Sequence, residues 1–264
     1  MKIVGVIPAR WGSTRFPGKS LAVLAGKPVV QWVFERASAA RLLDQVVVAT
    51  DDERIRSAVE QFGGSAVMTA LNHPSGTDRV AEAVDGLGAD IIINIQGDEP
   101  FIDPRLVDRL AEAMTMREGD WDMATAASPI TDERDLKNPS VVKVVWAADG
   151  RALYFSRSPI PFDRDGGHGM QADLYWRHLG IYAYTGSFLK RLVATRPSLL
   201  EEVEKLEQLR ALHIGGRIKV LQAAGIGTGI DTPEDLANAE RTIRTQTAAD
   251  GTGGRPKDGN RSTR

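Results

Sequence analysis

The most informative stretch of this 264-residue chain is Ile7-Pro-Ala-Arg-Trp-Gly-Ser-Thr-Arg-Phe-Pro-Gly-Lys19. It follows a short apolar run, Lys2 to Ile7, that predicts a buried first strand. Arg10, Arg15 and Lys19 then fall in a loop that contains two glycines. Such a loop lets backbone N–H groups approach a phosphate closely, and the cations neutralise its charge. The pattern indicates a site for a nucleotide triphosphate, although a solvated basic turn would also account for the charges.

This loop is not a P-loop, although Gly12 and Gly18-Lys19-Ser20 resemble one. A P-loop has four residues between its glycines, whereas five separate Gly12 from Gly18 here. Pro17 also lacks the N–H group that a phosphate cradle would use. We therefore reject a P-loop nucleotide triphosphatase.

The composition narrows the class of protein. An apolar content of 42% suffices for a substantial core in one large domain or two small ones. The formal charge of −2 does not imply a nucleic-acid partner, so basic clusters are expected to bind small anions. The lack of cysteine excludes disulfides and thiolate metal sites. No signal peptide or run of about 18 apolar residues is present, so we expect a cytoplasmic protein without membrane insertion.

Strand and helix patterns alternate through the first half of the chain. Wholly apolar strands separated by amphipathic helices predict an α/β fold with a parallel sheet covered on both faces. Ligands of such sheets bind beyond the carboxyl ends of the strands, where the glycine loop lies. We expect strands at 2–7, 45–49, 66–68 and 90–95, and helices at 29–40, 52–62, 77–87 and 104–116.

The second half is less regular. We expect strands at 141–146, 176–184 and 217–222, and helices at 188–195, 199–212 and 232–244. Ser156–Pro161 contains two prolines and is therefore not expected in a central strand. The last residues lack apolar periodicity, so we expect one domain of residues 1–245 and a disordered tail of residues 246–264.

Two acidic residues lie where a metal ion could bind. Asp98, in Gln96-Gly-Asp-Glu-Pro100, follows a buried strand and a glycine. Mg²⁺ usually takes one or two carboxylates plus phosphate oxygens. Asp231 precedes Thr232-Pro233 at the start of a helix, from which a short acid can also reach a metal. A turn or an N-cap is the alternative role for either aspartate.

A third segment, Asn72-His-Pro-Ser-Gly-Thr-Asp-Arg79, opens a helix with hydroxyl and N–H groups. Arg79 lies in the first turn, where a cation opposes the helix dipole. This placement suggests a contact with an anion or a base, and a salt bridge to Glu82 is the simpler explanation.

Together these segments resemble the cytidylyltransferases that activate acidic 2-keto sugars, and above all the branch that acts on 3-deoxy-manno-octulosonate (Kdo). The resemblance spans residues 1 to about 245 and is carried by Ile7–Lys19, His73–Arg79, Gln96–Pro100, Tyr154–Pro161, His178–Tyr182 and Gly229–Leu236. It implies a Rossmann-like parallel or mixed sheet of nucleotide-diphospho-sugar transferase type. The chain departs from the family at Trp11-Gly12, where Tyr and a small residue are commoner, and at Ser20, where Pro is common.

The resemblance also implies an activity. CMP would pass from CTP to the anomeric 2-hydroxyl of Kdo, and diphosphate would leave, for lipopolysaccharide biosynthesis by a cytoplasmic homodimer. Mg²⁺ would lie on Asp98 and Asp231, and Lys19, Arg15 and Asp98 would serve the chemistry. The residues expected at CTP are Arg10, Ser13, Arg15, Lys19, His73, Ser75, Gly76, Arg79 and Gln96.

The acidic sugar needs a site of its own, which the resemblance places within about residues 150–215 together with dimer contacts. The expected residues are Arg157, His178, Tyr182, Glu204, Glu207 and Gln208. An arginine fork suits a carboxylate, and alternation puts His178 and Tyr182 on one strand face. Helical spacing puts Glu204 on one face with Glu207 and Gln208. A surface arginine, a half-exposed strand and a solvated charged helix are the alternatives.

Other activities remain open at this point. The sugar could be 8-amino-Kdo or sialic acid, although sialate-activating enzymes usually lack Gln-Gly-Asp-Glu-Pro. A non-catalytic nucleotide-binding homologue is a second alternative, against which Lys19, Asp98 and Asp231 argue. A nucleotidyltransferase acting on a sugar 1-phosphate usually has a longer Gly-rich Arg-Lys loop, which is absent here.

Overall fold

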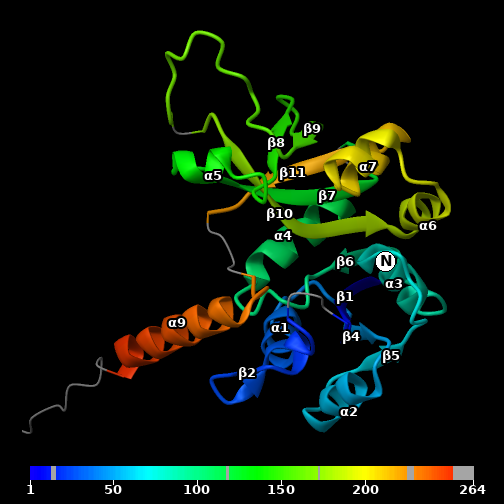
Figure 1. Cartoon of the computed structure of the whole chain (residues 1–264). Helices are drawn as coiled ribbons and strands as arrows, with labels where there is room; N and C mark the ends of the chain where they lie inside the picture. Colours follow the sequence, from blue (N-terminus) through cyan, green and yellow to red (C-terminus); the bar gives the residue numbers. More distant parts are fainter. Residues whose placement is uncertain (13–15, 117–118, 172, 225–228, 252–264) are drawn as a thin grey trace, which may run out of the picture.

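A computed structural model of the chain describes residues 1–12, 16–116, 119–171, 173–224 and 229–251 (Figure 1). Among these residues, nine strands form one mixed sheet in the order β11-β7-β10-β6-β1-β4-β5, with β8 paired to β10 and β9. The strands are β1 Ile3–Ala9, β4 Gln45–Thr50, β5 Ala66–Met68, β6 Ile91–Asn94, β7 Met123–Pro129, β8 Lys143–Trp146, β9 Ala152–Ser156, β10 Trp176–Thr185 and β11 Ile218–Gln222; β2 Val23–Leu24 and β3 Lys27–Pro28 form a separate hairpin.

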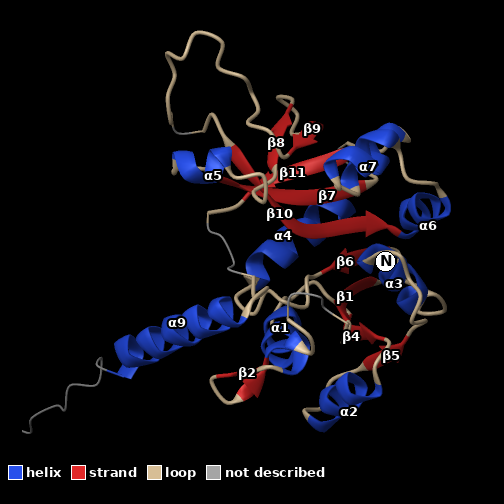
Figure 2. Ribbon diagram, viewed as in Figure 1, coloured by secondary structure: helices blue, strands red, loops and turns tan. Residues whose placement is uncertain are grey.

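Helices cover both faces of the sheet (Figure 2). One core cluster contains the apolar faces of α1, α2 and α4, and the other contains those of α3, α6 and α8. The helices are α1 Val29–Ser38, α2 Glu53–Gln61, α3 Gly76–Val84, α4 Pro104–Thr115, α5 Glu133–Lys137, α6 Gly186–Ala194, α7 Leu199–Glu204, α8 Gln208–His213 and α9 Pro233–Gly251, with a 3₁₀ turn η1 at Lys19–Leu21. The predicted α/β class is therefore confirmed.

The alternation of β1 shows why the parallel strands are apolar throughout. Ile3 and Ile7 enter the core cluster on one face, whereas Val4 and Val6 enter the cluster on the other. Successive side chains of a strand point to opposite faces, so a strand covered on both sides needs apolar residues at every position. β1 pairs in parallel with both β4 and β6.

The tenth strand runs against its neighbours and shapes the site. β10 is antiparallel to β6 and to β7, so the sheet is mixed, as the resemblance implied. Tyr182 of β10 pairs with Asn94, the last residue of β6. The residues that precede Tyr182 therefore extend past the carboxyl end of β6, where ligands of such sheets bind. A register shift between Leu179 and Tyr182 in the pairing with β7 marks a bulge there.

Most predicted elements are present with ends shifted by a few residues, but one predicted helix is wrong. The helix expected over 199–212 is two short helices, α7 and α8. Lys205 lies between them with a φ of 53°, a left-handed conformation that ends an α-helix. Strand β7, for which we had no expectation, occupies the centre of the second half of the sheet.

The last helix is longer than expected. α9 extends to Gly251, beyond residue 245, and residues 252–264 of the predicted disordered tail lie outside the described residues. The domain boundary therefore stays a prediction. Within the described part of the chain, no helix is both long and apolar enough to cross a membrane.

Candidate nucleotide and sugar site

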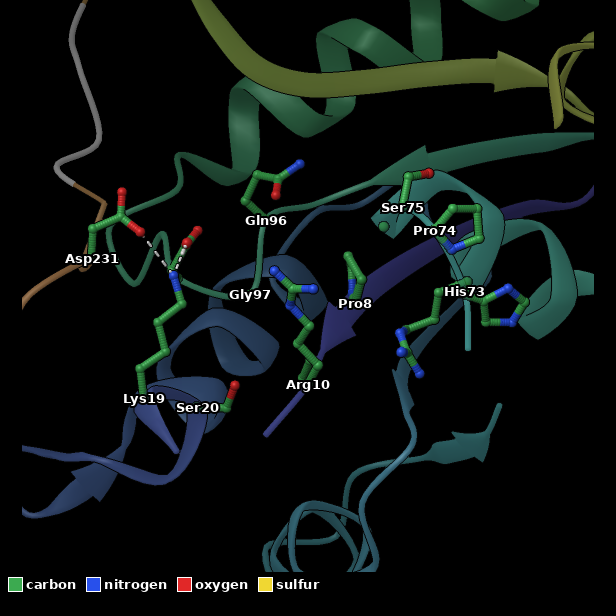
Figure 3. Close-up of a pocket in the computed structure, with 14 residues that line it drawn as sticks. Pro8, Arg10, Lys19, Ser20, His73, Pro74, Ser75, Gln96, Gly97 and Asp231 are labelled. Atoms are coloured by element: carbon green, nitrogen blue, oxygen red, sulfur yellow. Dashed lines mark hydrogen bonds and ion pairs between the residues drawn. The ribbon is translucent and has the colours of Figure 1, made fainter. Parts of the chain in front are cut away.

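A polar cavity of about 340 Å³ opens where β1 and β6 end (Figure 3). Its walls come from the end of β1 and the loop after it, η1, the segment before α3 and the first turn of α3, the turn after β6 and the segment before α9. The lining residues are Pro8, Ala9, Arg10, Lys19, Ser20, His73, Pro74, Ser75, Gly76, Arg79, Gln96, Gly97, Asp98 and Asp231. Of the residues expected at CTP or at the metal, every one that the structure describes lines this cavity. Ser13 and Arg15 lie outside the described residues.

The turn after β6 approaches the end of β1 closely. A Cβ atom added to Gly97 would lie 2.6 Å from the carbonyl oxygen of Pro8, closer than any real Cβ contact. Glycine at this position therefore lets the two strand ends converge on one cavity. Gln96 and Asp98 flank Gly97 and both line the cavity.

Lys19 joins the two predicted metal ligands. Its ammonium group hydrogen-bonds to Asp98 and lies 3.0 Å from Asp231 Oδ1 (Figure 3). Burial alone would lower the pKa of Lys19, but attraction from Asp98 and Asp231 outweighs burial, and the pKa of Lys19 is raised. The ammonium is therefore charged throughout the physiological pH range.

An N-cap was the alternative role expected for Asp231, but the N-cap of α9 is Thr232. Thr232 Oγ1 accepts a hydrogen bond from Asp235 N at 3.2 Å, and Asp235 Oδ2 accepts one from Thr232 N at 2.9 Å. This reciprocal pair is a capping box, although its acid is the shorter aspartate. The arrangement leaves the Asp231 carboxylate directed at Lys19, so capping and a contact in the cavity are compatible.

The segment before α3 differs from expectation in its ion pairs. Arg79 is buried, and its Nη2 atom lies 2.6 Å from Asp51 Oδ2, so the expected salt bridge to Glu82 does not form. Glu82 instead pairs with His73. A hydrogen bond from the Ala70 N–H group is the main cause of the lowered pKa of Glu82, and a hydrogen bond with His73 lowers this pKa further. Ser75 caps α3 by accepting hydrogen bonds from Thr77 N and Asp78 N.

A second cavity, of about 600 Å³, lies beside the first. The two are linked by Gln96, whose Nε2 atom donates a 2.9 Å hydrogen bond to the Gly180 carbonyl, at the bulge of β10. Bulges commonly re-aim side chains next to active sites. The lining residues are Asp135, Asn138, Ser140, Val141, Val142, Arg177, His178, Gly180, Tyr182, Lys205, Leu206, Glu207 and Gln208.

His178 and Tyr182 share the strand face that alternation predicted. Their ring centroids are 5.4 Å apart, and His178 Nε2 lies 2.9 Å from Thr125 Oγ1 of β7. Burial lowers the pKa of His178 to about 3, so the imidazole is neutral at physiological pH. Burial also raises the pKa of Tyr182, and nearby Glu207 and Glu99 add to this.

Gln208 presents an unused donor to this cavity. Its Oε1 atom accepts a 3.4 Å hydrogen bond from the Tyr182 hydroxyl. Its Nε2 atom is buried and has no hydrogen-bond partner within the described part of the chain. A buried amide donor without a partner is costly, and a ligand hydroxyl or carboxylate would satisfy it.

Arg157 and Glu204 do not line the second cavity. The guanidinium of Arg157 donates to the carbonyl oxygens of Glu204 and Pro139, at 2.6 and 2.8 Å. The Glu204 carboxylate accepts from Ser156 Oγ and Arg157 N, at 2.7 and 2.9 Å. Both side chains therefore join the end of β9 to the end of α7, and their contact with sugar stays a prediction.

Arg177 is a lining residue that sequence analysis missed. Its Nη2 atom lies 2.7 Å from Asp135 Oδ2, and its buried Nε atom has no hydrogen-bond partner among the described residues. Simple alternation places Arg177 on the face opposite His178, so the periodicity gave no signal for it. Proximity to His178 in the sequence was the only available hint.

The comparisons with known proteins identify the family of the chain. The sequence profile of the cytidylyltransferase family matches residues 4–219. A 3-deoxy-manno-octulosonate cytidylyltransferase from Thermodesulfovibrio yellowstonii is 51% identical over 256 residues, covering 93% of this chain and 99% of the relative. An 8-amino-3,8-dideoxy-manno-octulosonate cytidylyltransferase from Shewanella frigidimarina is 47% identical over 243 residues, covering 91% and 98%.

A solved structure is similarly close. A CMP:2-keto-3-deoxy-manno-octonic acid synthetase complexed with CTP matches with a TM-score of 0.88 and 43% identity, over 93% of this chain and 100% of that one. The sequence motifs, the sheet order and these relatives lead to one conclusion. The chain belongs to the cytidylyltransferase family and, within it, to the 3-deoxy-manno-octulosonate cytidylyltransferases.

Proposed function

We propose that the protein transfers CMP from CTP to the anomeric 2-hydroxyl of Kdo and releases diphosphate. The convergence of Lys19, Asp98 and Asp231 in a cavity next to a second, sugar-sized cavity carries this proposal. The name of the relative that is 51% identical supports Kdo as the acceptor, and the CTP in the similar solved structure supports the donor. In the reaction, the hydroxyl oxygen attacks the α-phosphorus in line, the bond from phosphorus to the leaving diphosphate breaks, and the hydroxyl proton passes to water.

The chain's own residues lower the barrier by position and charge. Arg10 and Lys19 would neutralise the triphosphate and the departing diphosphate, and Arg15 is proposed to join them. His73, Ser75, Gly76 and Arg79 would hold the nucleoside, as would Ser13 and Gln96. Around the sugar, Gln208 would donate to a hydroxyl or to the carboxylate. No side chain is assigned as a dedicated general base.

We propose Mg²⁺ as the cofactor. Oxygens of Asp98 and Asp231 both approach the same ammonium, so the space between them is suited to one cation held by hard oxygen ligands. Within the described residues no group of three or more histidine, cysteine or acidic side chains could hold a metal, so the remaining ligands would be phosphate oxygens and water. Bound there, Mg²⁺ would supply charge stabilisation at the α-phosphate.

We also propose a homodimer that acts in the cytoplasm. Leu153 of β9 and Leu199, Leu200 and Val203 of α7 are exposed apolar side chains, and a partner surface would cover them. CTP is an intracellular metabolite, which supports the cytoplasm. Light scattering during size-exclusion chromatography gives the assembly mass, and a monomer at micromolar concentration would exclude the dimer.

A second acceptor is favoured by one specific observation. A relative that is 47% identical over nearly its whole length is named for 8-amino-Kdo. The amine replaces a single hydroxyl, so a small change in the second cavity could exchange the two substrates. We therefore keep 8-amino-Kdo as the alternative acceptor.

The test is diphosphate release with CTP and Mg²⁺ in the presence of Kdo, 8-amino-Kdo or sialic acid, with ATP, GTP and UTP as donor controls. Release with CTP and Kdo alone supports the proposal. Release with another of these sugars keeps the mechanism and changes the acceptor. CTP binding without release from any sugar would leave a non-catalytic nucleotide-binding homologue.

A further inference from the structure

We propose that Trp11 and Arg54 form a stacked pair that positions Arg10 and Lys19 for the triphosphate of CTP. The inference rests on the proposed function, because it assigns a positioning role at the same nucleotide cavity. Trp11 lines neither cavity, and it is one of the positions at which this chain departs from the family pattern.

The Trp11 ring contacts two parts of the chain. The guanidinium carbon of Arg54 lies 3.4 Å from the ring centroid. A Cβ atom added to Gly18 would lie only 2.8 Å from the same ring, so the indole packs directly against the glycine backbone. Gly18 has a φ of 71°, which favours glycine for a second reason. The indole ring therefore occupies space that the side chain of any larger residue at position 18 would fill.

A backbone hydrogen bond reinforces this contact. Gly18 N donates to the carbonyl oxygen of Trp11 at 3.0 Å. Arg10 directly precedes Trp11, and Lys19 directly follows Gly18; both line the nucleotide cavity. The contact between Trp11 and Gly18 therefore sets the separation of these two cations. Residues 13–15 lie outside the described part and carry none of this argument.

Arg54 is itself held in place. Asp52 Oδ1 accepts from Arg54 N and from Arg54 Nε, both at 2.9 Å, and Asp52 Oδ2 accepts from Nη2 at 2.6 Å. Asp52 is also the N-cap of α2. The plane of the guanidinium is thus fixed by a bidentate contact before it stacks on Trp11.

These contacts form a chain from the sheet to the phosphate site. The start of α2 follows β4 directly, so Asp52 and Arg54 are anchored at the carboxyl edge of the sheet. Arg54 fixes Trp11 and Trp11 fixes Gly18, which places the ammonium of Lys19 between Asp98 and Asp231. A tryptophan offers a larger aromatic face to a guanidinium than a tyrosine does.

A double-mutant cycle tests the pair. The variants are Trp11→Ala, Arg54→Met and the double variant, with Arg56→Met as a matched control on the same helix. Arg56 pairs with Glu53 instead, at 2.7 Å. KM for CTP, KM for Kdo and kcat are measured for each, and CTP binding is measured by calorimetry.

We expect KM for CTP to rise about tenfold in Trp11→Ala and about threefold in Arg54→Met, with KM for Kdo changed less than about twofold. The double variant should match Trp11→Ala alone, because residues that act through one contact are not additive. Arg56→Met should behave as the unmodified protein.

Three results would overturn the proposal. The first is a rise of KM for CTP in the double variant that equals the product of the two single rises. The others are equal rises of KM for CTP and KM for Kdo, or the same KM for CTP in Arg54→Met and Arg56→Met. If Trp11→Ala does not fold, the comparison of the two Arg→Met variants still decides. If the unmodified protein releases no diphosphate with Kdo, the proposed function fails, but CTP calorimetry on the same variants still tests the pair.

Discussion

The ammonium nitrogen of Lys19 lies 3.0 Å from Oδ1 of Asp231, although 212 residues separate them in the sequence. Asp98 approaches the same ammonium from the turn after β6. The cation thus connects η1, near the start of the chain, with the segment that precedes α9. Because both carboxylates are held by one cation, each is positioned before any substrate binds, and the removal of either one should affect turnover more than folding.

Asp98→Asn should lower kcat at least about 100-fold, because an amide keeps the shape of the side chain but loses its charge. Protection of the protein by CTP against thermal unfolding should largely survive. Diphosphate release and the CTP-induced rise in Tm are the two measurements. Asp85→Asn is the control, since this carboxylate is exposed and its cation is 4.0 Å away. Turnover near normal in Asp98→Asn would remove Asp98 from the mechanism.

Arg79→Ala should destabilise the fold by about 3–5 kcal/mol, because it leaves the largely buried carboxylate of Asp51 without its cation. Denaturant unfolding gives this value. Lys137→Ala, which breaks an exposed pair with Glu133, should cost less than about 1 kcal/mol. If Arg79→Ala keeps its stability and only loses CTP affinity, Arg79 is a nucleotide ligand and not a structural residue.

The His178 imidazole should remain neutral well below pH 6. Burial lowers its pKa to about 3, whereas the unfolded chain takes up this proton near pH 6.5. Its contribution to stability is therefore complete above pH 6.5 and is lost as the pH falls toward 3. Between pH 7 and pH 5 the loss should be about 2 kcal/mol.

Two measurements check this pH dependence. An NMR titration of the histidine ring protons should show no midpoint for His178 above about pH 4.5. The free energy of unfolding of His178→Asn should fall less between pH 7 and pH 5 than that of the unmodified protein. His213→Asn is the control, because His213 is exposed. A His178 midpoint close to 6.5 would refute the prediction.

Gln208→Leu should raise KM for Kdo several-fold and leave KM for CTP unchanged. The buried Nε2 atom of Gln208 has no partner among the described residues, and its Oε1 atom accepts only a long, 3.4 Å hydrogen bond from the Tyr182 hydroxyl, so the substitution should lower the free energy of unfolding by no more than about 1 kcal/mol. Steady-state kinetics and denaturant unfolding together test this. Gln61→Leu, an exposed position on α2, should change neither quantity. A lower stability with unchanged KM for Kdo would show that Gln208 serves the fold alone.

Local sequence predicted the parallel strands around β1 because they are short, mostly apolar runs rich in valine and isoleucine. β4 contains Val46-Val-Val48 and β6 contains Ile91-Ile-Ile93. Strand β7, Met123–Pro129, is rich in small residues with low β-propensity. It is a strand because β10 and β11 pair with it on its two sides, which local sequence does not reveal.

Residues of the site could be predicted where they belong to one contiguous motif. They could not be predicted where their position depends on partners distant in the sequence. Motifs predicted which residues gather around Lys19, but alternation could not place Arg177 in the second cavity. Helical spacing joined Glu204 to Glu207, whereas the left-handed Lys205 separates them into two helices. Arg157 looked available for a carboxylate because the sequence cannot show that backbone carbonyls surround its guanidinium.

The reversed direction of β10 has an evolutionary consequence. The first cavity is lined largely by residues 8–98, whereas the second is lined by residues 135–208, four of which belong to β10. The hydrogen bond from Gln96 to Gly180 joins the two cavities directly. With the proposed function, substitutions around β10 would change the acceptor sugar while the residues around Lys19 keep the phosphate chemistry, so a new acceptor would not require a new catalytic centre.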